Sequence, residues 1–140
     1  MVRTVLTNGH GLSMASEDYL ETIYLLDKDD ESGSGVRSVN VAETMNVSKA
    51  SVNKAIATLK EAGMVEQMRY GRVSLTDEGR EYARRVWRSH RVLRAFLIKE
   101  LGVLPEVADE EACLMEHYLS DDTVDRWCGY LVRQGVDISA

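Results

Sequence analysis

The stretch VNVAETMNVSKASVNKAIATLKEAG, residues 39–63, decides the fold of this chain. Apolar residues recur at helical spacing over residues 39–45 and again over residues 49–62, and a short break separates the two segments. Ser48 is suited to cap the start of the second segment, and Gly63 is suited to end it. A short helix, a tight turn and a second helix form a helix-turn-helix.

The residues that follow change from a helical period to a strand period. Over residues 64–75, alternating side chains flank the pair Tyr70-Gly71, which predicts a two-stranded hairpin with Gly71 in the turn. A helix-turn-helix followed by a hairpin is a winged helix. The expected fold is therefore mainly α with a small β wing.

Helices are also predicted on both sides of this region. One covers residues 16–28 with Ser16 as its N-cap, and a long one starts after Thr76. It is expected to run to about residue 101, with further helices at residues 105–119 and 121–134. The predicted division is a flexible tail at residues 1–13, a winged-helix DNA-binding domain at residues 14–76 and a helical domain at residues 77–140.

Charge is distributed unevenly along the chain. The formal net charge is −6, but residues 36–94 carry +6, residues 1–35 carry −5 and residues 95–140 carry −7. The local charge rather than the total decides an electrostatic footprint on DNA, so the basic middle segment is suited to face phosphate.

The second helix of the helix-turn-helix carries polar side chains of the kinds that reach base edges and phosphates in a major groove. The tip of the hairpin adds basic side chains that can meet the adjacent DNA backbone. Any single one of them is equally explained as a solvated side chain. The predicted DNA-binding residues are Ser48, Lys49, Ser51, Asn53, Lys54, Arg69 and Arg72.

The bulk composition excludes other classes of protein. No apolar run approaches the roughly 18 residues that a membrane-spanning helix needs. The first residues show no signal-peptide pattern, and two cysteines in 140 residues do not form a disulfide framework. The expected location is the cytoplasm.

A group of metal-ligand types occurs in the run Cys113-Leu114-Met115-Glu116-His117. Residues three and four apart share a helix face, so Cys113 is expected to point the same way as Glu116 and His117. A thiol, a carboxylate and an imidazole together suit a first-row divalent metal.

Two weaker signals lie earlier in the chain. Asp18 and Glu21 are three apart on a predicted helix, although a solvated helix face also explains them. His90 lies on the apolar face of the long helix, where a buried core histidine is the alternative interpretation.

These motifs, in this order, resemble the iron- and manganese-dependent repressors of the diphtheria toxin repressor and manganese transport regulator family. The resemblance runs from about residue 16 to residue 132 and rests on residues 16–24 (SEDYLETIY), 89–91 (SHR) and 109–120 (DEEACLMEHYLS). It implies a homodimeric repressor that binds double-stranded operator DNA when loaded with Mn²⁺ or Fe²⁺ and controls metal-uptake genes. The helical domain would bind the metal and dimerise.

The match to the family is mixed between its two branches. Asp18 and Glu21 resemble the manganese branch, Cys113 resembles the iron branch, and the other implied ligands match both. A thiolate shifts preference toward Fe²⁺, Co²⁺ or Zn²⁺, so Fe²⁺ and Mn²⁺ lead and Zn²⁺ stays open. Arg94 stands where both branches carry an acidic residue, and a guanidinium there would repel a second cation. The implied metal-binding residues are Asp18, Glu21, His90, Cys113, Glu116 and His117.

Apolar residues on the last two helices predict the dimer interface. Packing on the long helix of the same chain is the alternative. The residues concerned are Leu114, Leu119, Val124, Trp127, Tyr130 and Leu131.

Three other functions remain open on the sequence. A winged-helix transcription factor can respond to another ligand or to no metal, and a minority of winged helices bind protein instead of DNA. A small metalloenzyme is disfavoured, because the sequence shows neither a Gly-rich phosphate loop nor a nucleophile–base pair.

Overall fold

The computed structural model describes residues 11–138 and confirms a mainly helical fold with a small β wing. The first ten residues of the expected tail lie outside this described part. The chain forms two compact units, one from Met14 to Arg84 and one that combines residues 11–13 with the chain from Arg85 onward. The division falls inside helix α4 (Asp77–Lys99), whereas the expected domain boundary lies at the start of this helix. No helix among the described residues is both long and apolar enough to cross a membrane.

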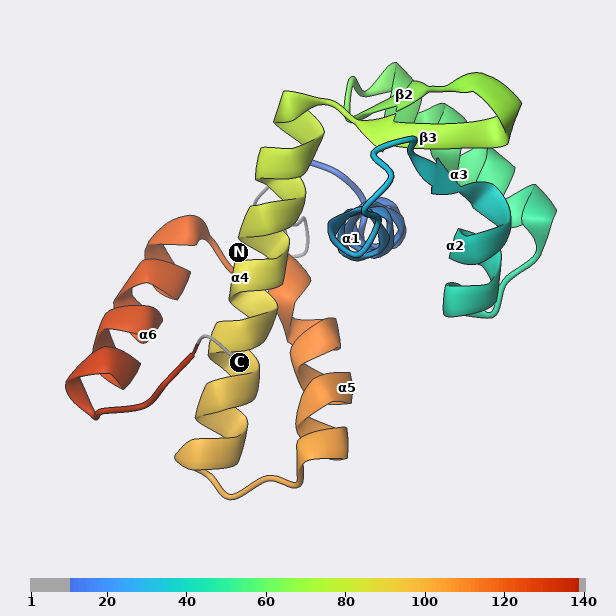
Figure 1. Ribbon diagram of the computed structural model, residues 1–140. Coiled ribbons are helices and arrows are strands. Elements are labelled where there is room, and N and C mark those ends of the chain that lie inside the picture. Colours follow the sequence, from blue (N-terminus) through green and yellow to red (C-terminus); the bar gives the residue numbers. More distant parts are fainter. Residues whose placement is uncertain (1–10, 139–140) are drawn as a thin grey trace, which may run out of the picture. The chain divides into compact units, whose positions relative to one another are not determined.

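The unit Met14–Arg84 is a three-stranded antiparallel sheet with the order β1-β3-β2, packed on three helices (Figure 1). Leu20, Val41, Val52 and Leu59 are buried between the helices. The elements of this unit before α4 are α1 (Met14–Lys28), β1 (Val36–Arg37), α2 (Ser38–Met45), α3 (Lys49–Glu61), β2 (Val65–Gln67) and β3 (Arg72–Leu75).

The helix-turn-helix is formed by α2 and α3. Asn46 ends α2 in the left-handed conformation with φ of 55°, and Ser48 caps α3 by accepting a hydrogen bond from the backbone N–H of Ser51 at 3.1 Å. The predicted cap is therefore confirmed. The prediction for Ser16 is wrong, because α1 begins at Met14 and Ser16 is a buried residue inside the helix.

The wing is the hairpin of β2 and β3, in which Val65 pairs with Leu75. Its tip is a 3₁₀ turn, Arg69–Gly71, with positive φ at both Tyr70 and Gly71. Strand β1 was not predicted, because two residues are too short to show a period.

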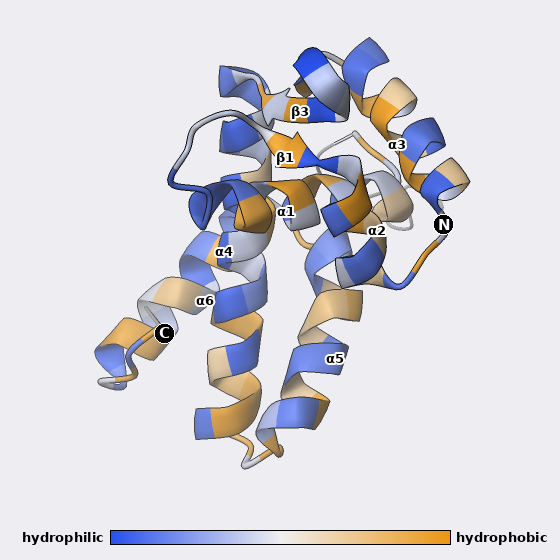
Figure 2. Ribbon diagram, turned by 45° about the vertical axis from the view of Figure 1, so that its right-hand side comes forward, coloured by the Kyte–Doolittle hydropathy of each residue, from blue (hydrophilic) through white to orange (hydrophobic). Residues whose placement is uncertain are grey.

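The unit from Arg85 onward packs α5 (Pro105–Met115) and α6 (Asp121–Arg133) on either side of the C-terminal half of α4 (Figure 1). The hydrophilic and hydrophobic stretches alternate along α5 (Figure 2), as expected of a helix with one covered face. The helix expected to reach residue 119 is shorter, because a 3₁₀ turn, Glu116–Tyr118, replaces its last part.

Of the six apolar residues predicted to form the dimer interface, some are buried within the chain and others are exposed. Val124 and Leu131 of α6 form a core with Val92 of α4, so the interface prediction is wrong for these two. Leu119 and Trp127 are partly buried against the same core. Only Leu114 and Tyr130 of the six are exposed.

Candidate metal centre and nucleic-acid interface

Three of the predicted ligands meet in the unit from Arg85 onward. His90 comes from α4, Cys113 from the last turn of α5, and Glu116 from the start of the 3₁₀ turn. One ligand atom from each lies within 4.8 Å of the others. His90 Nδ1 is 2.9 Å from Glu116 Oε2, a hydrogen-bond distance.

The two residues that follow α5, at the start of the 3₁₀ turn, have buried side chains. Both Glu116 and His117 are fully buried, and His117 Nε2 lies 3.7 Å from Glu116 Oε1. Cys113, one turn earlier, is half-buried. The buried Glu116 carboxylate therefore lies close to the thiol of Cys113 and to the imidazoles of His90 and His117.

An ion pair between Arg94 and Asp109 lies beside Nε2 of His90. His90 Nε2 lies 3.4 Å from Asp109 Oδ1, and Arg94 Nε donates to the same oxygen at 2.6 Å. Trp87 stacks on the His90 ring at a centroid distance of 5.0 Å. This stacking was missed in the sequence, although the separation of three residues on a helix is a signal for it.

The other two predicted ligands belong to α1 in the unit Met14–Arg84. Asp18 is half-buried and Glu21 is buried, and carboxylate oxygens of the two residues lie within 4.8 Å of each other. Glu17, immediately before this pair, is also buried and accepts a hydrogen bond from the hydroxyl of Tyr82 at 2.6 Å.

The donor sets fit a divalent cation by their chemistry. A buried carboxylate carries a high cost of desolvation unless a positive charge is close. Thiolate, carboxylate and imidazole are ligands for Fe²⁺, Co²⁺ and Zn²⁺, whereas the oxygen pair of α1 suits Mn²⁺.

The start of α3 presents the polar side chains predicted to contact DNA. Lys49, Ser51, Asn53 and Lys54 are all exposed. The hydroxyl of Ser48 hydrogen-bonds to Ser51 Oγ at 2.9 Å, so these two serines also serve the local cap.

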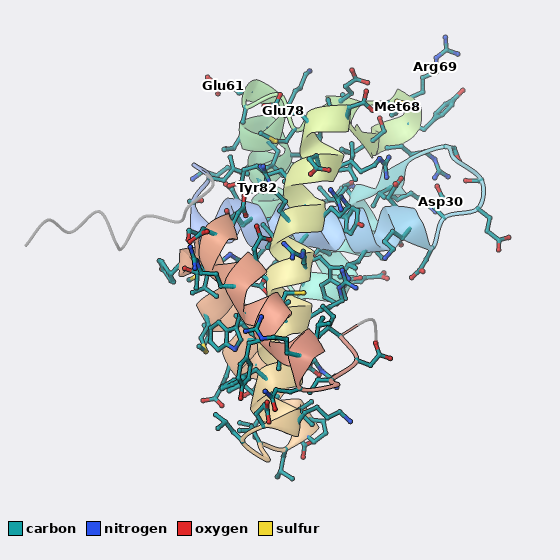
Figure 3. All side chains as sticks on the ribbon, turned by 90° about the vertical axis from the view of Figure 1, so that its left-hand side faces the viewer. Asp30, Glu61, Met68, Arg69, Glu78 and Tyr82 are labelled. Carbon is teal, nitrogen blue, oxygen red and sulfur yellow. The ribbon has the colours of Figure 1, made fainter. Side chains whose placement is uncertain are left out.

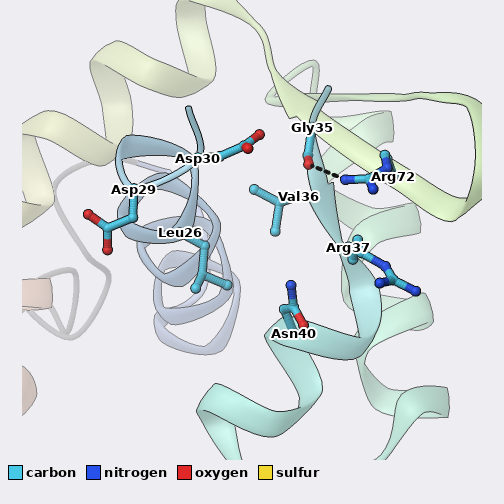
Figure 4. A pocket seen from close by; sticks show the side chains of 8 residues that line it. All are labelled: Leu26, Asp29, Asp30, Gly35, Val36, Arg37, Asn40 and Arg72. Atoms are coloured by element: carbon cyan, nitrogen blue, oxygen red, sulfur yellow. Dashed lines mark hydrogen bonds between the residues drawn. The ribbon is translucent and has the colours of Figure 1, made fainter. Parts of the chain in front are cut away.

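The two arginines predicted at the wing differ in their surroundings. Arg69 is exposed and extends away from the wing tip (Figure 3). Arg72 is half-buried and donates to the carbonyl oxygen of Gly35 at 3.1 Å (Figure 4). It lines an open pocket of about 230 Å³ with Asp30 and Arg37. Arg72 therefore holds the loop before β1 to the wing.

Asp30 stabilises that loop. Its Oδ1 accepts hydrogen bonds from the hydroxyl of Ser32 at 2.6 Å and from the backbone N–H of Ser32 at 3.1 Å. These hydrogen bonds, with a smaller contribution from the charge of Arg72, hold the pKa of Asp30 below its ordinary value.

Both parts of the chain match models of known domains. The N-terminal DNA-binding domain of iron-dependent repressors matches residues 11–73, and their metal-binding and dimerisation domain matches residues 76–134.

Individual relatives agree with these matches. An uncharacterised HTH-type transcriptional regulator of Methanocaldococcus jannaschii is 34% identical over 82% of this chain and 90% of its own length. The transcriptional regulator MntR of Escherichia coli is 34% identical over 85% of this chain and 74% of its own length. The solved structure of the manganese regulator SloR superposes with a TM-score of 0.73 at 32% identity, over 84% of this chain. The match spans about half, 53%, of the SloR chain.

Proposed function

The chain belongs to the iron-dependent repressor family, and from this we propose that it is a metal-dependent transcriptional repressor that binds operator DNA as a homodimer. The observation that carries the proposal is the convergence of His90, Cys113 and Glu116 on one point beside the buried His117. A regulator of this kind would act on chromosomal DNA in the cytoplasm and control genes of metal uptake.

We assign the metal to Cys113, Glu116, His117 and His90, with Asp18 and Glu21 as further ligands. The support for Asp18 and Glu21 is chemical: octahedral Mn²⁺ prefers about six mostly oxygen ligands, more than the C-terminal group supplies. Their facing carboxylates repel each other, and Glu21 is buried. A bound cation would reduce this repulsion. The activating metal is Mn²⁺ or Fe²⁺. Because Cys113 offers a thiol, Co²⁺ and Zn²⁺ are also expected to bind in vitro.

The protein's own residues then perform the regulation. Carboxylates on α1 that bound the same cation as the C-terminal group would bring the DNA-binding unit under the control of the metal. In a homodimer, both copies of α3 engage DNA only when their spacing matches half-sites about 34–36 Å apart or a multiple. The exposed Lys49, Asn53 and Lys54 would read the groove, and Arg69 would contact the backbone.

The test compares DNA affinity with and without metal. A duplex selected from a random library by the Mn²⁺-loaded protein serves as the probe, and fluorescence anisotropy measures its affinity for wild type and Glu116→Gln under anaerobic conditions. Wild type is expected to bind tightly only with Mn²⁺ or Fe²⁺, and Glu116→Gln is expected to bind weakly throughout. Glu111→Gln, which changes an exposed carboxylate on the preceding helix α5, is the matched control and should behave as wild type.

One outcome would favour the alternative function, a winged-helix transcription factor that does not depend on metal. Equal affinity of wild type and Glu116→Gln, with and without metal, would mean a winged-helix regulator that does not respond to metal.

A further inference from the structure

The imidazole of His90 faces a carboxylate on each side of its ring. Nδ1 lies 2.9 Å from Glu116 Oε2 on the inner side, and Nε2 lies 3.4 Å from Asp109 Oδ1 on the outer side. The inner carboxylate is fully buried, whereas 52% of the Asp109 side chain is exposed. The ring therefore stands between the buried ligand group and an outer carboxylate that solvent ions can reach.

The outer pair has the spacing of two ligands of one ion. Metal–nitrogen and metal–oxygen bonds of about 2.0–2.2 Å place two ligands of the same ion roughly 3 to 3.5 Å apart. The distance of 3.4 Å between His90 Nε2 and Asp109 Oδ1 falls in this range. By this geometry alone, the chain would offer a second cation position outside the first.

The position between His90 and Asp109 already has a positive charge beside it, that of Arg94. Arg94, one helical turn after His90, directs Nε to Asp109 Oδ1 at 2.6 Å, the same oxygen that faces His90. A guanidinium does not lose its proton in proteins, so its charge persists at every working pH. A divalent ion between His90 and Asp109 would have to displace Arg94 from Asp109 and remain beside an unpaired cation.

We propose that the guanidinium of Arg94 takes the place of a second metal ion, so that each chain binds a single divalent cation. Asp109, held by Arg94, then faces Nε2 of His90 from outside at 3.4 Å and helps to keep Nδ1 directed at the Glu116 side. Arg94 is thus a positioning residue and a limit on metal stoichiometry. The inference rests on the proposed function, because it presumes that the first ion binds at Cys113 and Glu116.

The experiment counts ions on the full-length chain. Equilibrium dialysis with Mn²⁺, read by elemental analysis, and native mass spectrometry with Co²⁺ are applied to wild type and Arg94→Glu. Wild type is expected to bind one ion per chain, and Arg94→Glu is expected to bind two, because a carboxylate replaces the guanidinium beside Asp109. Arg88→Glu is the matched control: Arg88 lies on the same helix and pairs with Asp125, so its loss should leave the count at one.

A second variant and a double mutant make the result decisive. If circular dichroism shows that Arg94→Glu does not fold, Arg94→Ala is counted in its place, with two ions again expected. Adding Asp109→Ala to the variant should return the count to one. A count of two for wild type, or of one for the folded Arg94 variant, overturns the inference while leaving the proposed function intact. A count of zero for wild type instead contradicts the proposed function.

Discussion

Tyr82 donates its hydroxyl hydrogen to Oε2 of Glu17 at 2.6 Å, and both side chains are buried. The bond joins the first turns of α1 to the start of α4 within the unit Met14–Arg84. Glu17 directly precedes Asp18, so the bond anchors the turn of α1 that carries this candidate ligand.

Tyr82→Phe is expected to lower the free energy of unfolding by about 1.5–3 kcal/mol, the typical contribution of a hydrogen bond to a charged group. Urea unfolding of the metal-free protein followed by circular dichroism measures it. Tyr19→Phe, which changes a half-buried tyrosine of α1, is the control and should change stability much less. Equal effects of the two substitutions would contradict a specific role for the bond.

Lys49→Ala and Lys54→Ala are expected to weaken DNA binding without changing stability, because both side chains are exposed at the start of α3. Each lost phosphate contact should reduce the slope of log affinity against log salt by about 1. Lys60→Ala, at the far end of the same helix, should leave the slope unchanged. An unchanged slope in both test variants would remove these lysines from the interface.

Arg69→Ala and Arg72→Ala should separate DNA contact from loop anchoring. Arg69 is exposed at the wing tip, so its loss is expected to weaken DNA binding at unchanged melting temperature. Arg72 is bonded to Gly35, so its loss should lower the melting temperature of the DNA-free protein as well. Thermal unfolding and anisotropy together measure both effects, and the reverse pattern would refute the assignment.

Leu114→Glu is expected to convert the homodimer to a monomer. Leu114 is 62% exposed and lies two helical turns after the exposed Val107, on the same face of α5. An exposed apolar stripe of this kind marks an interface with a second copy of the chain. Light scattering after size exclusion measures the mass. Val132→Glu, equally exposed on α6, is the control, and a monomer from this control alone would place the interface on α6 instead.

The loop before β1 should add stability that depends on pH. Hydrogen bonds from Ser32 lower the pKa of Asp30 in the folded state, so the stabilisation is present above the ordinary aspartate pKa, about 4, and is lost as the pH falls through the lowered value. Ser32→Ala should raise the pKa of Asp30 and bring the loss of stability to higher pH. Carbon-detected NMR titration of the carboxyl group measures the pKa, and an unchanged value in the variant would contradict this account.

The local elements of this protein were determined by its sequence. The helix-turn-helix, the cap at Ser48 and the wing turn at Gly71 depend on periodicity and on backbone preferences of single residues. The motifs that identify the family, and the spacing of Cys113 and Glu116, could likewise be found without the structure.

Only the tertiary structure decided what each face contacts. Helical spacing shows that side chains share a face, but it does not show which neighbour covers that face. For this reason the sequence placed Val124 and Leu131 at a dimer interface, whereas they form the core beneath α6. Arg94 and Asp109 lie fifteen residues apart on different helices, and their pairing depends on how α5 packs against α4. Contacts between distant segments depend on the packing of whole elements, and these contacts set the charge around His90.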